Sequence, residues 1–289
     1  MRLHPCSSSL IAACFFIATS AFAQEQQIQF PQASQRHYFK QRVGLTDVEV
    51  EYSRPNKNKR EIFGSLVPYG KVWRTGANAT TKIKFSDAVK LGDKEIPVGE
   101  FVLFTIPNAN EWTVIVYKDT KVQSAGDYKQ ENDQARITAK PSRQANAMES
   151  FTIEISDVKG ASAMLNFVWD TTRVSVPLTT DDIEQVSRQL DVTVSGNTTL
   201  DPRIAYQAAS FYYDNNKDLN QAAKWIDQAL AANQDAYFMH FRRAQIQEKL
   251  GNKKEAAASA QKTIELLKKE PNADETAIKS AQEIVDKSK

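Results

Sequence analysis

The chain has 289 residues, of which 41% are hydrophobic and 25% are charged, and its formal net charge is +2. That length suits one large or two modest domains, and the composition is that of an ordinary globular protein. The nearly balanced charge argues against a nucleic-acid-binding protein, because such proteins usually have a surplus of basic residues on one face.

Residues 1–23 have the pattern of a secretory signal peptide. Arg2 supplies the positive start, Leu10–Ala18 an apolar run too short to span a bilayer, and Ala21-Phe22-Ala23 a cleavage site of small residues. We therefore expect cleavage after Ala23 and a periplasmic or secreted protein. No second apolar stretch is long enough to span a bilayer, so the sequence predicts no transmembrane segment.

Both cysteines, Cys6 and Cys14, fall inside this segment. The mature chain would then contain no thiol, and so neither a disulfide nor a thiolate metal site. Ile11–Cys14 loosely resembles a lipoprotein cleavage box. Most of the apolar residues follow Cys14 rather than precede it, so lipid anchoring there is the less favoured alternative.

Residues 24–37 are polar and predict a loose lead-in, whereas alternating apolar residues from Tyr38 onward predict β-strands. Strands expected at Val48–Ser53 and Thr81–Phe85 are separated by a long segment without regular periodicity. Long irregular segments inside domains are usually functional or disordered. We expect this one to be an ordered loop packed on the β-domain, because it contains Ile62, Phe63, Leu66, Val67, Tyr69, Val72 and Trp73.

Short apolar runs separated by turn residues continue as far as Leu178. They predict strands at Phe101–Ile106, Trp112–Tyr117, Ala135–Ala139, Ser150–Ile155, Ala163–Trp169 and Arg173–Leu178. No helical pattern interrupts them, which favours an antiparallel architecture, a sandwich or a barrel. We predict a β-sandwich domain over residues 38–178.

Residues 179–200 predict a linker. Asp181–Leu190 has the pattern of a short helix, and Asp191–Leu200 is interpreted as either a last strand or a linker. From Asp201 onward the apolar period becomes helical, and Asp201 followed by Pro202 is typical of a helix start.

Similar residues recur 34 positions apart in the helical region, as in Ala222 and Ala256, Leu230 and Ile264, and Asp218 and Asn252. This period is typical of tetratricopeptide-type helix pairs. Asp218 and Asn252 are expected to cap the second helix of each pair, Asn252 in a capping box with Glu255. A last helix is expected at Ala273–Lys287.

The predicted fold is thus segregated α+β: an antiparallel β-sandwich followed by a tetratricopeptide-like α-helical region over residues 201–289. Two helix pairs and one terminal helix are fewer than the three repeats that normally give independent stability. We therefore expect the helical region to lean on the β-domain.

Three strings of residues are unusually specific: Tyr52-Ser53-Arg54-Pro55, Arg60-Glu61-Ile62-Phe63-Gly64 and Trp73-Arg74-Thr75-Gly76-Ala77-Asn78. With them, Gln41–Leu178 closely resembles a bacterial family known as domain of unknown function 2911. The resemblance implies a protein exported by Gram-negative bacteria, often followed by a helical-repeat tail, and it implies no activity. The family also tends to show a Trp-Gly pair, a Tyr and Asp-x-x-Arg. Here Tyr128 and Asp133-x-x-Arg136 are present, but Ser124-Ala125-Gly126 replaces the Trp-Gly pair.

Six residues are candidates for ligand binding: Arg54, Trp73, Arg74, Asn78, Asp133 and Arg136. An arginine fork suits carboxylates and phosphates, and an indole face suits a sugar or peptide. The alternative is structural: Arg54 and Arg74 brace the long loop, because an arginine fork can satisfy several backbone carbonyls or pair with a partly buried carboxylate.

Enzyme signatures are mostly absent. The sequence contains no phosphate-binding Gly loop and no nucleophile elbow, and after signal removal only His37 and His240 remain as histidines. We predict no catalytic residue, metal or cofactor, although whether the protein is an enzyme stays open. The favoured function is binding or protein interaction in the cell envelope, with an anionic or carbohydrate ligand on the sandwich and a protein partner on the tail. The alternatives are a hydrolase of glycan or another envelope polymer, and a structural scaffold.

Overall fold

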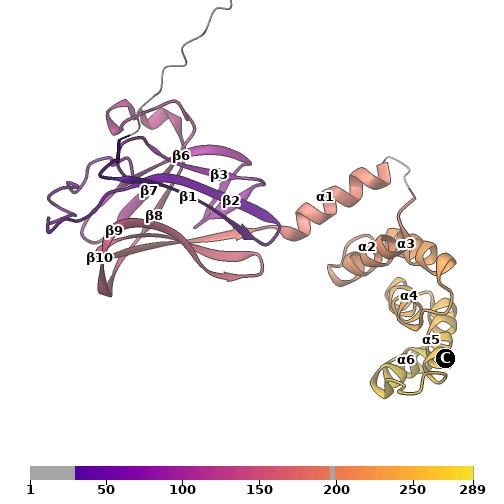
Figure 1. Ribbon diagram of the computed structural model, residues 1–289. Coiled ribbons are helices and arrows are strands. Elements are labelled where there is room, and N and C mark those ends of the chain that lie inside the picture. Colours follow the sequence, from indigo (N-terminus) through magenta and orange to yellow (C-terminus); the bar gives the residue numbers. More distant parts are fainter. Residues whose placement is uncertain (1–29, 196–198, 289) are drawn as a thin grey trace, which may run out of the picture. The chain divides into compact units, whose positions relative to one another are not determined.

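The computed structural model describes residues 30–195 and 199–288 (Figure 1). The expected signal peptide, its cleavage site and both cysteines lie outside the described residues. Two antiparallel sheets are followed by helices, which confirms the predicted α+β class.

The larger sheet has six strands in the order β1-β2-β3-β6-β7-β8. Their bounds are β1 Gln35–Val43, β2 Thr46–Arg54, β3 Thr81–Phe85, β6 Gly99–Ile106, β7 Trp112–Tyr117 and β8 Asp133–Ala139. The smaller sheet has the order β5-β4-β10-β9, with β4 Val89–Leu91, β5 Lys94–Ile96, β9 Pro141–Lys159 and β10 Ser162–Thr180. Figure 1 shows the two sheets as facing layers.

The main hydrophobic core lies between the sheets. Alternation along each strand sends one set of side chains inward, such as Val48 and Val50 from β2 and Phe167 and Trp169 from β10. A second, smaller core lies on the outer face of the six-stranded sheet and uses the opposite set, including Val102, Phe104, Ile115 and Tyr117. Two-sided burial explains why β6 and β7 read as nearly continuous apolar runs.

Two strand predictions were too short. The strands expected at Ala163–Trp169 and Arg173–Leu178 are one strand, β10, which pairs with β9 from Ser162 to Val174 and with β4 at its end. Asp170 interrupts the alternation, because it lies at a register shift and has a positive φ of 53°. β1 also begins at Gln35, before the expected Tyr38, since it pairs with β2 as far as Arg54.

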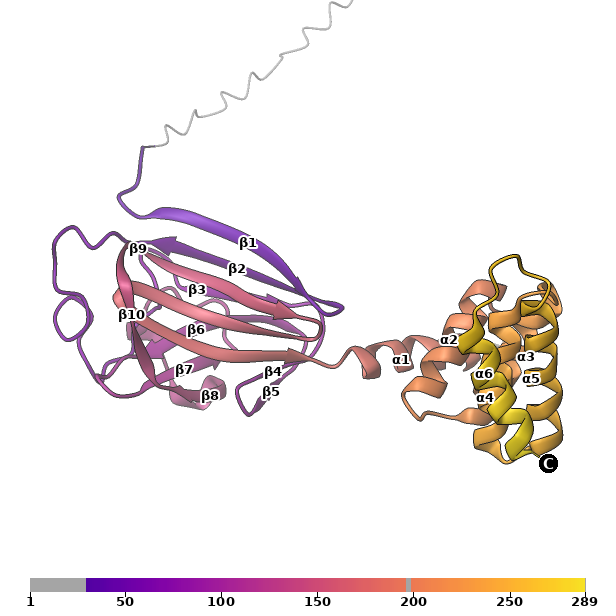
Figure 2. The ribbon, with the colours of Figure 1, turned by 90° about the horizontal axis from the view of Figure 1, so that it is seen from below.

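The long segment between β2 and β3 is ordered and packed, as expected (Figure 2). It first runs beside β9, where Lys57 N donates to the Glu149 carbonyl at 2.7 Å. Farther on it extends the six-stranded sheet, because Trp73 exchanges two backbone hydrogen bonds with Thr105 of β6, of 2.7 and 3.0 Å. β6 therefore pairs with β3 from Gly99 to Leu103 and with this segment at Thr105.

Helix α1, Asp182–Ser195, follows β10. The prediction that Asp191–Leu200 forms a strand or a linker was wrong for its first part, because the helix continues to Ser195. Its side chains explain the extension: Leu190 packs in an apolar cluster with α2 and α3, and Asp191 accepts a hydrogen bond from the Tyr212 hydroxyl at 3.1 Å.

The helical region contains α2 Pro202–Asp214, α3 Leu219–Ala232, α4 Tyr237–Leu250, α5 Lys253–Leu267 and α6 Glu275–Lys287. Asp201 and Asp218 cap α2 and α3 as predicted. The capping box predicted at Asn252 does not form, since the Asn252 amide instead donates to the Gln247 side chain at 2.7 Å. The last helix starts at Glu275 with Asp274 as its cap, not at Ala273.

The tetratricopeptide-like assignment of this region stays a prediction. Among the described residues, the helices are all too short or too polar to cross a membrane.

Candidate functional site

A β-bulge places Asp133 and Arg136 on one face of the sheet. Tyr117 is opposite Asp133, while the preceding Val116 is opposite Ala135, so Gln134 is an extra residue in β8. In a regular strand, residues three apart point to opposite faces. Because Gln134 is inserted, Asp133 and Arg136 lie opposite Tyr117 and Ile115, which point to the same face. Both side chains therefore lie on the outer face, away from the inter-sheet core.

Asp133 and Arg136 form a closed hydrogen-bonded cluster with Tyr128, which lies on the segment between β7 and β8. Arg136 Nη1 donates to Asp133 Oδ2 and to the Tyr128 hydroxyl, each at 2.8 Å. The Tyr128 hydroxyl in turn donates to Asp133 Oδ2 at 2.9 Å. Three bonds among three groups leave each side chain little freedom to move.

The cluster is unequally exposed. The Asp133 side chain is 9% exposed and that of Arg136 is 36% exposed. Asp133 Oδ1 is buried and has no hydrogen-bond partner among the described residues. Arg136 donates only through Nη1 within that part of the chain, and its Nε and Nη2 have no acceptor there.

Tyr128 and Arg136 both keep their protons over the ordinary pH range. Burial and the hydrogen bond to Asp133 raise the pKa of Tyr128 to about 12, so that its hydroxyl keeps its proton. Burial lowers the pKa of Arg136, but the hydrogen bond to Asp133 and the neighbouring groups outweigh that effect and raise it above its ordinary value. The cluster therefore offers a permanently charged guanidinium.

The Tyr128 ring also lines a hollow of about 630 Å³ over the outer face of the sheet. Its floor is the second core, in which the rings of Phe104, Tyr117 and Tyr128 lie 5.2 to 5.5 Å apart. The other lining residues come from the segment after β7: Asp119, Lys121, Val122, Gln123, Gly126, Asp127, Lys129 and Asn132.

The segment around this hollow is held by its own polar groups. Ser124 and Asp127 form a capping box around a short 3-10 turn, Ala125–Asp127. The Tyr117 hydroxyl accepts from Lys129 N at 3.2 Å and from Asn132 Nδ2 at 3.3 Å. Thr80 Oγ1 donates to the Val122 carbonyl at 2.9 Å, which ties the segment to the start of β3.

The arginine at the end of β2 has a different environment. Arg54 Nε donates to the Phe151 carbonyl at 3.1 Å, and Nη2 donates to Thr152 Oγ1 at 2.7 Å. Both acceptors belong to β9 in the opposite sheet. Arg54 therefore joins the two sheets, a structural role that differs from the predicted bracing of the long loop.

Arg74, Asn78 and Trp73 have partners within or near their own segment. Arg74 Nη1 donates to the Asn78 carbonyl, and Asn78 Nδ2 donates to the Ser34 carbonyl at 3.2 Å. The Trp73 ring stacks on Trp169 at 5.9 Å and packs edge-on against Phe151 at 4.9 Å. These contacts stabilise the segment, and a ligand role for the three residues stays a prediction.

The structure thus brings together Asp133 with Arg136, and Arg74 with Asn78. Sequence reasoning omitted Tyr128, Lys121 and Lys129 from the candidate residues. The signal available for Tyr128 was its spacing from Asp133-x-x-Arg136, which the family resemblance had already drawn attention to. Lys121 and Lys129 had no signal, because isolated lysines in a turn-rich segment are usually only solvated.

No metal centre is evident. Within residues 30–195 and 199–288, no group of three or more His, Cys, Asp or Glu side chains is arranged to hold an ion. A second hollow, of about 370 Å³, lies at the start of α1, where Arg188 and Asp87 pair at 2.9 Å. Arg188 also lies 3.7 Å from Glu184, and Gln185 donates to Thr46, so these side chains are already bound within the protein.

Comparison with known proteins gives a family but no activity. A family model described as "Protein of unknown function (DUF2911)" matches residues 34–178, about half of the chain. The matched region contains both sheets and the whole cluster of Tyr128, Asp133 and Arg136. A search of curated proteins found no match.

Proposed function

Since the chain belongs to the DUF2911 family, for which no activity is known, its function has to be inferred from the site itself, and we propose that the β-sandwich is a binding module for a small, oxygen-rich ligand. The binding site is the hollow lined by Tyr128, together with the adjacent guanidinium of Arg136. A volume of about 630 Å³ lies within the usual range for small-molecule sites.

The observation that supports this proposal most is the state of Arg136. Asp133 and Tyr128 fix its position with two hydrogen bonds of 2.8 Å, yet the donors on Nε and Nη2 have no partner in the described part of the chain. A guanidinium fixed in this way loses little side-chain entropy when a ligand oxygen accepts from it.

The hydrolase alternative has weaker support. A general acid needs a raised carboxyl pKa. In the hollow, hydrogen bonds from the Ser124 hydroxyl and backbone N–H hold the pKa of Asp127 below its ordinary value. Asp119 accepts from the Lys121 N–H at 3.0 Å, within a turn. Both carboxylates are therefore engaged in shaping the segment.

A ligand screen on the full chain tests the binding proposal. The probes are glucose, N-acetylglucosamine, glucuronate, glucose 6-phosphate and citrate, and the readout is the thermal unfolding midpoint. We expect at least one probe to raise the midpoint of the wild type and to have no effect on Arg136→Gln. The proposal fails if no probe shifts the wild type, or if the shift persists in Arg136→Gln.

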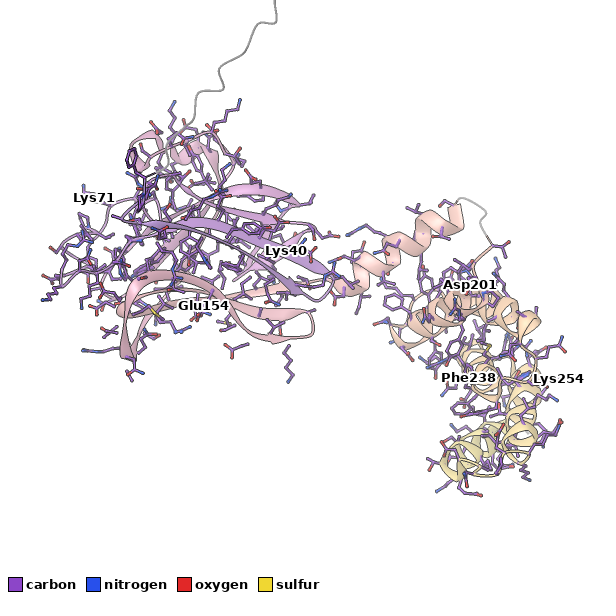
Figure 3. All side chains as sticks on the ribbon, viewed as in Figure 1. Lys40, Lys71, Glu154, Asp201, Phe238 and Lys254 are labelled. Atoms are coloured by element: carbon purple, nitrogen blue, oxygen red, sulfur yellow. The ribbon has the colours of Figure 1, made fainter. Side chains whose placement is uncertain are left out.

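Arg173 provides a matched control for this screen. It is 31% exposed, and its Nη1 lies 2.9 Å from Glu154 Oε1, on the four-stranded sheet (Figure 3). Arg173→Gln thus removes a similarly exposed and similarly paired arginine elsewhere in the sandwich. It is expected to respond to the probes like the wild type.

A protein partner on the helical region is a second proposal, supported by an exposed apolar surface. Ile204 of α2 and Phe238 of α4 are large apolar residues exposed to solvent, and the Phe238 ring packs against Tyr206 at 5.1 Å. Exposed apolar groups often mark interaction surfaces. Pull-down from a periplasmic extract with the full chain and with Ile204→Ser/Phe238→Ser tests it, and identical partner lists would contradict it.

Export is the premise shared by both proposals. If the segment before Gln24 is a signal peptide, the intact mass of the exported protein corresponds to a chain that begins at Gln24. A mass that shows a lipid on Cys14 would contradict this start.

A further inference from the structure

We infer that the ligand of this hollow is a small organic anion, bound through a carboxylate or phosphate group by Arg136, Lys121 and Lys129. The inference rests on the proposed function, because it names the chemical class of the ligand at that same site. It is based on which polar side chains at the hollow already form hydrogen bonds or ion pairs within the protein and which do not.

The formal charges around the hollow do not by themselves favour either sign. Two basic residues, Lys121 and Lys129, and two acidic ones, Asp119 and Asp127, line the hollow. Arg136 and Asp133 add one charge of each sign beside it, where both are hydrogen-bonded to the Tyr128 hydroxyl. A count of charges would therefore suggest a neutral ligand. The preferred sign of the ligand depends instead on which of these groups already have hydrogen-bond partners within the protein.

The acidic groups are already occupied by protein donors. Asp127 Oδ2 accepts from the Ser124 N–H at 3.1 Å and from its hydroxyl at 2.9 Å. Asp133 Oδ2 accepts from Tyr128 and Arg136, and its Oδ1 is buried away from the surface. Asp119 Oδ1 accepts from the Lys121 backbone N–H. A ligand entering the hollow thus meets carboxylates whose charge is partly compensated.

The basic groups are in the opposite state. Neither Lys121 nor Lys129 forms an ion pair within the described residues, and both side chains are exposed at the hollow. Arg136, beside the hollow, has no partner for Nε or Nη2 among the described residues. The two lysines of the hollow and the neighbouring Arg136 are therefore positively charged donors, and such donors favour an oxyanion over a neutral hydroxyl.

The remaining groups suit a small organic body attached to that anion. The partly buried Tyr128 ring supplies an apolar face. The amides of Asn132 and Gln123 also line the hollow, but they already donate to the Tyr117 hydroxyl and to the Lys121 carbonyl. An inorganic ion would leave most of a hollow of about 630 Å³ filled by water. We therefore expect the anionic group to be one part of a larger polar molecule.

Calorimetric titration of the full chain with three related compounds tests the inference. Glucose, glucuronate and glucose 6-phosphate share a pyranose ring and differ in having no anionic group, a carboxylate or a phosphate. We expect at least one of the two anions to bind about tenfold more tightly than glucose or better, with an affinity that falls as salt is added. The comparison of glucuronate with glucose 6-phosphate identifies which anion the site prefers.

A double variant separates the lysines from the rest of the site. Lys121→Gln/Lys129→Gln is expected to weaken anion binding about tenfold and to leave glucose affinity unchanged. Its control is Lys253→Gln/Lys254→Gln, which removes the same charge from the exposed start of α5 (Figure 3) and should have no effect.

The outcomes distinguish this inference from the proposed function. If glucose binds as tightly as both anions and Arg136→Gln abolishes that binding, the hollow is a binding site but the anionic class is wrong. If the lysine double variant binds the anions like the wild type, the role assigned to the two lysines is contradicted. If none of the three compounds binds the wild type at millimolar concentration, the inference fails. The proposed function fails as well if N-acetylglucosamine and citrate also leave the unfolding midpoint of the wild type unchanged.

Discussion

Two sets of arginines in the same sandwich are used in different ways. Arg60 and Arg74 lie in the long segment between β2 and β3 and donate to backbone carbonyls of that segment. Arg54, at the end of β2, donates to the Phe151 carbonyl and the Thr152 hydroxyl of β9. Arg136 lies on β8 and donates to a carboxylate and a tyrosine hydroxyl, both of which are side-chain acceptors. In the long segment, arginine side chains hold the backbone in place. On β8, neighbouring side chains hold the arginine in place.

The difference identifies a usable criterion for a binding arginine. An arginine that donates to main-chain carbonyls stabilises an irregular segment, because those carbonyls lack strand partners. An arginine whose partners are buried side chains, with donors left over, is preorganised for an outside acceptor. Substitutions in the two regions should therefore separate a loss of stability from a loss of binding.

The largest loss of stability is expected from Trp73→Ala. The Trp73 ring contacts Trp169, Phe151 and Phe63 at the end of the inter-sheet core. Removing a large aromatic side chain from such a cluster costs about 3–5 kcal/mol of unfolding free energy. Urea unfolding followed by circular dichroism measures it. Leu66→Ala, at an exposed position of the same segment, is the control and should cost less than about 1 kcal/mol.

A smaller loss is expected from Arg54→Gln. The substitution leaves the Phe151 carbonyl and the Thr152 hydroxyl on β9 without their donor, and we expect a loss of about 1–2 kcal/mol. The affinity for any probe bound in the hollow should stay as in the wild type. A variant of wild-type stability that no longer binds the probe would place Arg54 in the binding site and contradict the comparison.

The regular part of this fold was predictable from the sequence, because strand alternation directly encodes which side chains are buried. The core pair Val48 and Val50 illustrates this. The course of the segment between β2 and β3 was not, because it depends on distant partners such as Thr105 and Glu149. Sequence could indicate that the segment is ordered, from its apolar content, but not what it packs against.

The candidate site was partly predictable for a related reason. Asp133 and Arg136 were selected, yet their spacing in a regular strand would place them on opposite faces. Only the bulge at Gln134 brings them together, and a bulge is set by the pairing of β8 with β7. Tyr128, the third member, lies in a turn whose folded position could not be derived from periodicity.

A moderate effect is expected from Asp133→Asn, measured through the ionisation of Tyr128. Burial and the hydrogen bond to Asp133 raise the pKa of Tyr128 to about 12. The uncharged amide removes the second cause, so we expect the pKa of Tyr128 to fall while staying above its ordinary value. Ultraviolet difference titration against Tyr128→Phe isolates this tyrosine from the others. An unchanged pKa would show that Asp133 does not control the Tyr128 hydroxyl.

The raised pKa of Tyr128 also gives stability a pH dependence with a defined sign. The folded state holds the phenolic proton more tightly than the unfolded state, whose tyrosines have a pKa of about 10. The contribution of Tyr128 is therefore complete below about pH 10 and is lost as pH rises toward about 12. In Tyr128→Phe, the decline in unfolding free energy over this window should be shallower.

The smallest effect is expected from Arg60→Gln, and it tests what makes a backbone-bonded arginine important. Arg60 and Arg54 each make two hydrogen bonds, but the guanidinium of Arg60 is exposed and donates to the carbonyls of Asn56 and Lys57. Water can replace those bonds, so the expected cost is less than about 0.5 kcal/mol of unfolding free energy. A cost equal to that of Arg54→Gln in the same urea experiment would mean that the number of bonds matters, and not the partial burial that distinguishes Arg54.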